Sequence, residues 1–104
     1  MRMVHVALDR SLVADFCRRW GVSELAVFGS AVRDDFGPES DLDVLVSPLP
    51  GAAWSLLQLS EMRDELAALA GRPVDLVVRR AVERSPNWVR RREILESAET
   101  VYAA

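Results

Sequence analysis

The sequence predicts a small α/β domain, of the α+β type, with a mixed sheet of at least three strands flanked by helices. Apolar residues recur at helical spacing in two segments. Short apolar runs between Gly- and Pro-rich turns predict the strands. The chain has 104 residues and is 50% apolar, which fits one modest core, so we predict one domain over 1–104.

Three helices are expected along the chain. The apolar repeats predict helices over 8–20 and about 53–70, which end at Gly21 and Gly71. The repeats consist of Leu8, Leu12, Phe16 and Trp20 in the first helix and of Leu56, Leu59, Met62, Leu66 and Leu69 in the second. Ser85-Pro86 resembles a helix cap followed by a first-turn proline, so a third helix is predicted to run to about Ala98.

Three apolar runs, over 24–28, 41–46 and 74–78, predict strands. Residues 29–40 contain two Gly, one Pro and two Ser among several acids, which indicates a turn and then a loop. A helical turn is expected there around 31–34.

The composition narrows the function classes. All 13 basic residues are arginine, which excludes a Walker A lysine and a lysine Schiff base. A net charge of -3 argues against binding to nucleic acid through overall charge. No apolar run reaches the roughly 18–20 residues of a membrane span, and the single Cys17 suits a reducing compartment, so a cytoplasmic location is expected.

Two aspartates begin the second predicted strand, in the run DLDVLV. Because side chains alternate along a strand, Asp41 and Asp43 project from the same face. Neighbouring carboxylates repel each other unless a cation lies between them, and Mg²⁺ prefers oxygen ligands. Asp75 is the one charged residue of VDLVV and reaches the same place if the two strands are neighbours. The three acids could then hold one or two metal ions for phosphoryl transfer.

Gly29-Ser30 stands where a strand ends and a turn begins, so its backbone N–H groups can face an anion. Arg33 could reach a phosphate oxygen. Simpler interpretations exist for each feature. The aspartates could be solvated loop and cap residues, Gly-Ser an ordinary turn, and Arg33 a partner of Asp34, Asp35 or Glu39. The joint occurrence of these features favours a site.

The stretch GSAVRDDFGPESDLDVLV resembles the signature of the polymerase-β-like nucleotidyltransferase superfamily, in which Gly-Ser is followed by S-D-x-D. The short length, the G-S-x-x-R form, VDLVV and the RREILESAETVY tail resemble the minimal nucleotidyltransferase (MNT) group. Members often have R-G-D or R-G-E where this chain has Arg33-Asp34-Asp35.

The resemblance implies an enzyme with a minimal nucleotidyltransferase fold. Asp41, Asp43 and Asp75 would be the catalytic, metal-binding acids, and Gly29, Ser30, Arg33 and Ser40 would bind the nucleotide. The reaction implied is Mg²⁺-dependent transfer of AMP from ATP to a tyrosine hydroxyl of a HEPN-domain toxin, for which the chain would be the antitoxin. The partners expected are that toxin and a nucleoside triphosphate, in a homo-oligomer or a hetero-oligomer with the toxin.

Two alternatives stay open. The chain could neutralise the toxin by masking it without catalysis, or it could transfer a nucleotide to a small molecule or RNA. A basic stretch is interpreted as a solvated helix face with surface pairs, with contact to an acidic partner as the alternative; it consists of Arg79, Arg80, Arg84 and Arg90–Arg92. Trp54, Trp88 and Tyr102 are interpreted as packing or interface residues.

Overall fold

The computed structural model describes residues 8–29 and 40–104 as four helices and four strands in these ranges. In chain order the elements are α1 (Arg10–Trp20), β1 (Val22–Phe28), β2 (Leu42–Pro48), α2 (Leu56–Ala70), β3 (Val74–Val78), α3 (Arg79–Glu83), α4 (Trp88–Ser97) and β4 (Glu99–Ala103). The predicted α/β class with helices flanking a sheet is confirmed.

The sheet has the strand order β3-β2-β1-β4. β1 pairs antiparallel with β2 and β4, whereas β2 and β3 are parallel, so the sheet is mixed as predicted. α2 supplies the crossover that a parallel pair requires. The parallel register pairs Leu42 with Val74 and Asp43 with Asp75. The starts of β2 and β3 therefore lie side by side.

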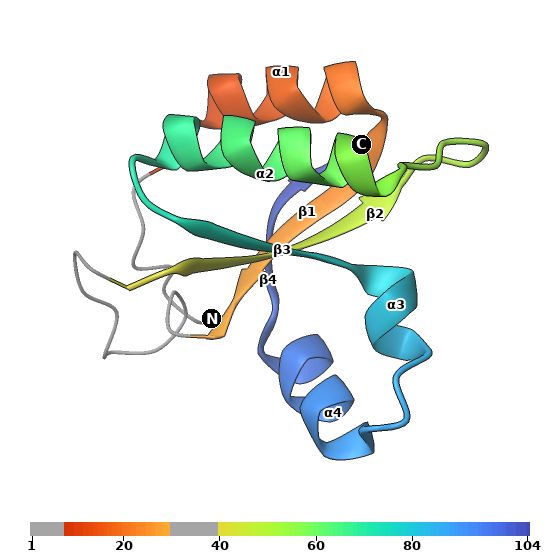
Figure 1. Cartoon of the computed structure of the whole chain (residues 1–104). Coiled ribbons are helices and arrows are strands. Elements are labelled where there is room, and N and C mark those ends of the chain that lie inside the picture. Colours follow the sequence, from red (N-terminus) through yellow and green to blue (C-terminus); the bar gives the residue numbers. More distant parts are fainter. Residues whose placement is uncertain (1–7, 30–39) are drawn as a thin grey trace.

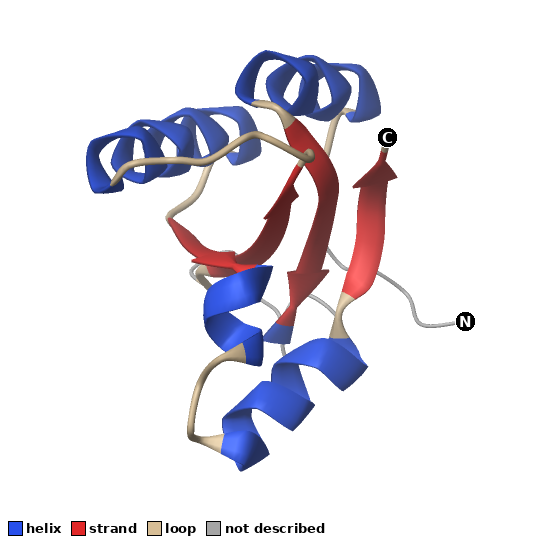
Figure 2. Ribbon diagram, turned by 90° about the vertical axis from the view of Figure 1, so that its right-hand side faces the viewer, coloured by secondary structure: helices blue, strands red, loops and turns tan. Residues whose placement is uncertain are grey.

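Helices cover both faces of the sheet (Figures 1 and 2). α1 and α2 pack on one face, where Leu42, Val44 and Val46 of β2 join the larger core cluster. α3 and α4 lie on the other face, where Leu45 belongs to a second cluster with Val82 and Ile94. Both faces of β2 are thus apolar beyond its first residues, which explains its nearly continuous apolar sequence.

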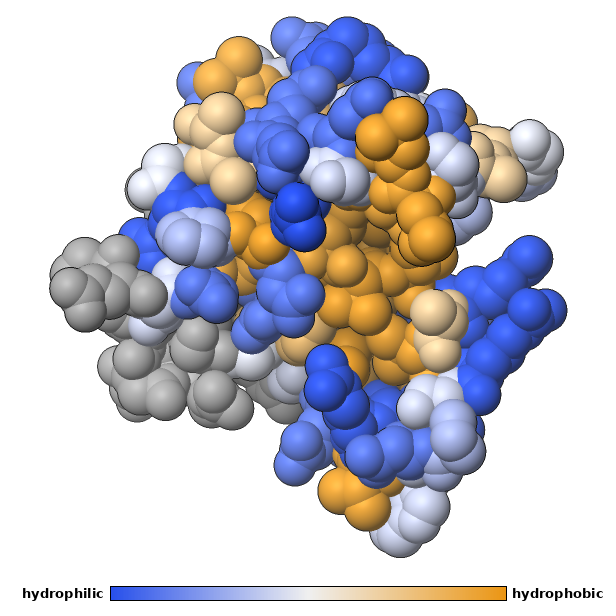
Figure 3. Space-filling model, in the orientation of Figure 1, coloured by the Kyte–Doolittle hydropathy of each residue, from blue (hydrophilic) through white to orange (hydrophobic). Residues whose placement is uncertain are grey.

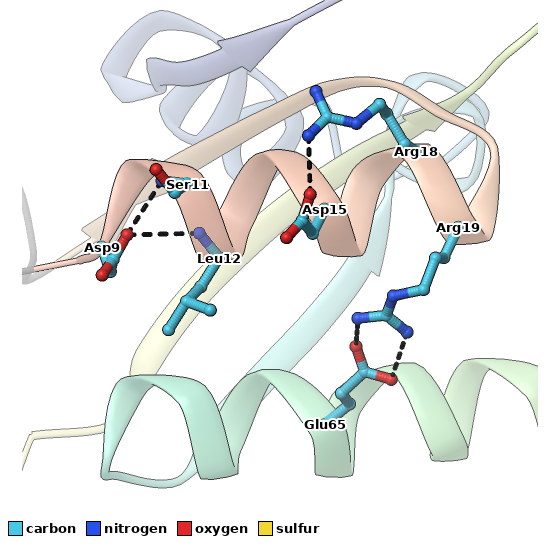
Figure 4. Close-up of polar contacts among 7 residues, drawn as sticks. All are labelled: Asp9, Ser11, Leu12, Asp15, Arg18, Arg19 and Glu65. Atoms are coloured by element: carbon cyan, nitrogen blue, oxygen red, sulfur yellow. Dashed lines mark hydrogen bonds and ion pairs between the residues drawn. The ribbon is translucent and has the colours of Figure 1, made fainter.

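Capping residues begin and end α1, and an ion pair joins α1 to α2 (Figure 4). The Asp9 carboxylate accepts hydrogen bonds from the backbone N–H groups of Ser11 and Leu12, which starts α1. Gly21, at φ 70°, ends it in the left-handed region. Arg19 of α1 forms a two-pronged ion pair with Glu65 of α2, with one arm at 3.1 Å. The two helices are thereby joined at their polar edge as well as through the core.

Four details differ from the sequence predictions. The C-terminal segment 99–103 forms β4 beside β1, and a short helix, α3, follows β3 directly. The N-cap of α4 is Asn87 and not Ser85, because the Asn87 side chain accepts from the backbone N–H of Arg90. Asp41 precedes β2, which begins at Leu42 and extends to Pro48. The helical turn predicted around 31–34 lies outside the described residues.

Apolar surface is exposed near one edge of the sheet. Figure 3 shows apolar atoms gathered between α2 and α3, where the edge strand β3 passes. At the start of α2, Leu56 and Leu57 are 87% and 70% exposed. None of the helices in the described ranges is long and apolar enough to cross a membrane.

Candidate active site

The site is built around Asp43 and Asp75, which the parallel pairing of β2 and β3 makes direct neighbours. Residues directly opposite in a parallel pair project from the same face of the sheet. Leu45 and Val77, two residues further along each strand, contact the cluster on the α3–α4 face. Asp43 and Asp75 therefore point to that face as well. The two strands are neighbours, which is the condition under which Asp75 could reach the same place as Asp43.

The backbone of Gly29 lies directly beside the Asp43 carboxylate. Phe28 is the antiparallel partner of Asp43, so Gly29 follows directly at the end of β1. A Cβ built on Gly29 would collide with Asp43 Oδ2 and lie 3.3 Å from its Cγ. Gly29 also has a φ of 66°, which disfavours residues with a side chain. Both facts favour glycine at this position and keep the Asp43 carboxylate where it is.

Asp41 and Ser40 approach the same end of the sheet from the preceding segment. The backbone N–H of Leu42 donates to the Pro73 carbonyl at 2.9 Å, which extends the parallel pairing past the strand start. Arg72 Nη1 donates to the Ser40 carbonyl at 3.3 Å. The turn before β3 thus anchors residues 40–42, while the Asp41 side chain remains exposed.

A cavity of about 730 Å³ opens beside Asp43, which is within the size range of small-ligand sites. Phe28, Gly29 and Asp43 form the sheet side of this cavity, and α4 with its cap forms the opposite side. The lining residues on the α4 side are Asn87, Val89, Arg90, Glu93, Ile94, Glu96 and Ser97. The sheet and α4 together line an open space next to Asp43.

The sequence interpretation missed the α4 side of the cavity. It treated Arg90–Arg92 as one solvated helix face, and this fits Arg92, which pairs with Glu96 on the exposed surface. Arg90 instead lines the cavity with Asp43. The signal available in the sequence was the spacing Arg90, Glu93, Ile94 and Ser97, which places these residues on one helix face.

The structure assembles part of the predicted site. Gly29, Ser40, Asp41, Asp43 and Asp75 gather at one end of the sheet, whereas Ser30 and Arg33 lie outside the described residues. Within residues 8–29 and 40–104, no three Asp, Glu, His or Cys side chains converge closely enough to hold a metal ion. Asp43 and Asp75 do supply the oxygen donors that suit a hard divalent cation.

Comparison with known proteins assigns the chain to a family. The model of the nucleotidyltransferase domain matches residues 9–101, which include the candidate acids, Gly29 and α4. The chain belongs to this nucleotidyltransferase family. The resemblance seen in the sequence is thereby confirmed.

Individual relatives point to the minimal members of the nucleotidyltransferase family. The protein adenylyltransferase MntA of Thermococcus cleftensis is 42% identical over 67 residues, which are 62% of this chain and 64% of that protein. The match thus spans slightly less than two thirds of the length of that relative.

Solved structures show the same fold. A candidate minimal nucleotidyltransferase, 33% identical, superposes with a TM-score of 0.65 over 86% of each chain. A complex of an AMPylated Shewanella oneidensis HEPN toxin with its MNT antitoxin gives a TM-score of 0.60 at 18% identity, covering 91% of this chain and 70% of the other. At that identity the likeness shows the fold alone.

Proposed function

We propose that the chain is an antitoxin-type nucleotidyltransferase that transfers AMP from ATP to a tyrosine hydroxyl of a HEPN-domain toxin in the cytoplasm. The observation that carries this proposal is the register of β2 and β3, which sets Asp75 beside Asp43, and Asp43 lines a cavity of small-ligand size. The similarity to a protein adenylyltransferase supports AMP as the transferred group and a protein as the acceptor.

In the proposed reaction, the tyrosine oxygen attacks the α-phosphorus of ATP. The bond from that phosphorus to the oxygen bridging to the β-phosphate breaks, pyrophosphate leaves, and the hydroxyl proton passes to a carboxylate or water. Asp43 and Asp75 would hold Mg²⁺, and Asp41 would complete the set through a change of its exposed side-chain rotamer. The ion, when bound, would supply neutralisation of phosphate charge.

The other residues of this chain position the nucleotide in this proposal. Gly29 leaves room for backbone to approach a phosphate beside Asp43, which a side chain would block. Ser30 and Arg33 would contact the triphosphate, as the family resemblance implies. The Ser40 carbonyl is held by Arg72, so Ser40 would fix the chain that precedes the acids.

A protein partner is also supported by the surface. Leu56 and Leu57 lie at the start of α2 with 87% and 70% exposure, and apolar atoms also gather between α2 and α3 (Figure 3). Large exposed apolar side chains grouped in this way are typical of protein interfaces. This observation also favours the second candidate function, in which the chain neutralises the toxin by masking it.

The test is to combine the chain with the HEPN-domain protein proposed as its partner and Mg-ATP, and to analyse that partner by mass spectrometry. The expected product is a partner that carries AMP on tyrosine. Asp43→Asn should abolish transfer, while Asp64→Asn, at an exposed acid on α2, should retain it. An unmodified partner in a stable complex would refute the enzymatic proposal.

Toxicity measurements separate the two candidate functions. If Asp43→Asn still neutralises the toxin as well as the wild type does, masking is sufficient. Modification of a small molecule or an RNA end, in the absence of the partner, would instead identify a different acceptor.

A further inference from the structure

We propose that Arg90 of α4 is a substrate-binding residue that contacts the phosphates of the nucleotide from the side of the cavity opposite Asp43. This inference rests on the proposed function and adds to it a binding residue from the C-terminal helix. It would give this small fold a cation facing the acids, on an element outside the Gly-Ser and aspartate motifs.

The position of Arg90 is the first support. Arg90 lines the cavity that also exposes Gly29 and Asp43. Among the described residues that line it, Arg90 is the only basic one, whereas Asp43, Glu93 and Glu96 are acidic. A polyanion entering this cavity therefore meets the positive side chain of Arg90, and a guanidinium matches phosphate oxygens with two donors.

The contacts of the neighbouring arginines are the second support. Arg91 Nη1 donates to the Ser85 carbonyl at 2.9 Å, and Arg92 Nε lies 3.1 Å from Glu96 Oε1. Each of these guanidinium groups already has a structural partner. The guanidinium of Arg90 has no hydrogen bond or ion pair with any residue of the described part of the chain.

The anchoring of α4 is the third support, because a binding residue needs a fixed backbone. The Asn87 side chain caps the helix by accepting from the backbone N–H of Arg90 at 3.1 Å. Ile94, one turn further, is buried with Leu45 and Val82 against the sheet. Arg90 is therefore held on a helix that is docked on the same sheet as Asp43, so its reach toward the cavity is set by the core.

Ion pairs with the acids of α4 do not explain why an arginine occupies position 90. Glu96 already pairs with Arg92. Glu93 lies three residues from Arg90, at a spacing that allows an ion pair, yet no such pair forms within the described residues. If Arg90 only balanced these acids, its removal would change the stability of the helix and leave nucleotide binding unaffected.

The experiment measures binding of Mg-ATP, magnesium tripolyphosphate and adenosine to the full chain by calorimetry. Arg90→Gln should weaken binding of the two polyphosphates about tenfold to a hundredfold, as expected for loss of a charge-assisted hydrogen bond. Arg90→Lys should restore part of this loss. The thermal midpoint of Arg90→Gln should equal that of the wild type, because no described bond is removed.

Two control variants each remove one charge: Arg84→Gln removes a positive charge, as Arg90→Gln does, and Glu93→Gln removes a negative one. Arg84→Gln removes an exposed arginine that follows α3 and lines neither described cavity, so it should leave polyphosphate binding unchanged. Glu93→Gln removes an acid from the same cavity wall and should not weaken binding. Equal losses in Arg84→Gln and Arg90→Gln would show a general charge effect and overturn the assignment.

The remaining outcomes separate this inference from the proposed function. Unchanged polyphosphate binding in Arg90→Gln would overturn the role of Arg90 alone. Equal weakening of adenosine and ATP would place Arg90 at the nucleoside and overturn the phosphate contact. A wild type that binds polyphosphate but leaves the partner unmodified would refute the proposed acceptor and retain Arg90. A wild type that binds neither polyphosphate would refute both.

Discussion

Replacement of Gly29 by alanine should uncouple activity from stability, because the new methyl group has two separate effects. At φ 66°, alanine adopts a left-handed conformation that costs about 1–2 kcal/mol. In a domain of this size each 1 kcal/mol lowers the thermal midpoint by roughly 4–8 °C. The chain should therefore still fold at room temperature.

The second effect of Gly29→Ala is on the candidate site. The added Cβ overlaps Asp43 Oδ2, so the carboxylate must rotate away from its present position. A displacement of about 1 Å at a reacting centre can lower a rate by roughly 100-fold. We expect single-turnover transfer of AMP to the partner to fall by about that factor.

Gly51→Ala is the matched control. Gly51 has a φ of 85°, and a Cβ built there meets nothing within 4 Å. It lies in the turn after β2, at the opposite end of that strand from Asp43. This variant should lose a similar amount of stability and retain transfer. Equal transfer rates in the two variants, measured well below both thermal midpoints, would refute the reasoning about Asp43.

Three further predictions concern the larger core cluster and the ion pair between α1 and α2. Met62→Ala removes a fully buried side chain from the larger core cluster and should lower the free energy of unfolding by about 2–5 kcal/mol, measured by urea denaturation. Burial raises the pKa of the Cys17 thiol to about 12, so alkylation at pH 8 should occur only as the chain unfolds; rapid labelling of the native chain would contradict this. The Arg19 hydrogen bond lowers the pKa of Glu65 below its ordinary value of 4.5, and the Trp20 indole N–H donates to the same carboxylate. The stability that Glu65 contributes should therefore be present above pH 4.5 and be lost as the pH falls through the lowered pKa, so Glu65→Gln and the wild type should converge in acid.

Local structure was predictable where the signal is local. The apolar repeats and the glycines after them predicted α1 and α2, since a helix encodes its period and its cap within a few residues. The cap of α4 was misassigned because Ser85 and Asn87 are both good N-cap residues, and the choice depends on where the chain leaves α3. The sequence also predicted the strands that contain Asp43 and Asp75.

The tertiary structure decided which strands pair and which side chains each helix packs against. The sequence did not predict β4, because Glu99–Ala103 gains its strand pairing from β1, which lies over 70 residues earlier. Likewise, the sequence did not distinguish Arg90 from Arg91 and Arg92. Only the packing of α4 places Arg90 in the cavity that Gly29 and Asp43 also line. By itself the sequence determined the acids, the glycine and the family pattern. The parallel register that joins Asp43 to Asp75, and the helix that faces them, follow from long-range pairing and packing, which no local pattern encodes.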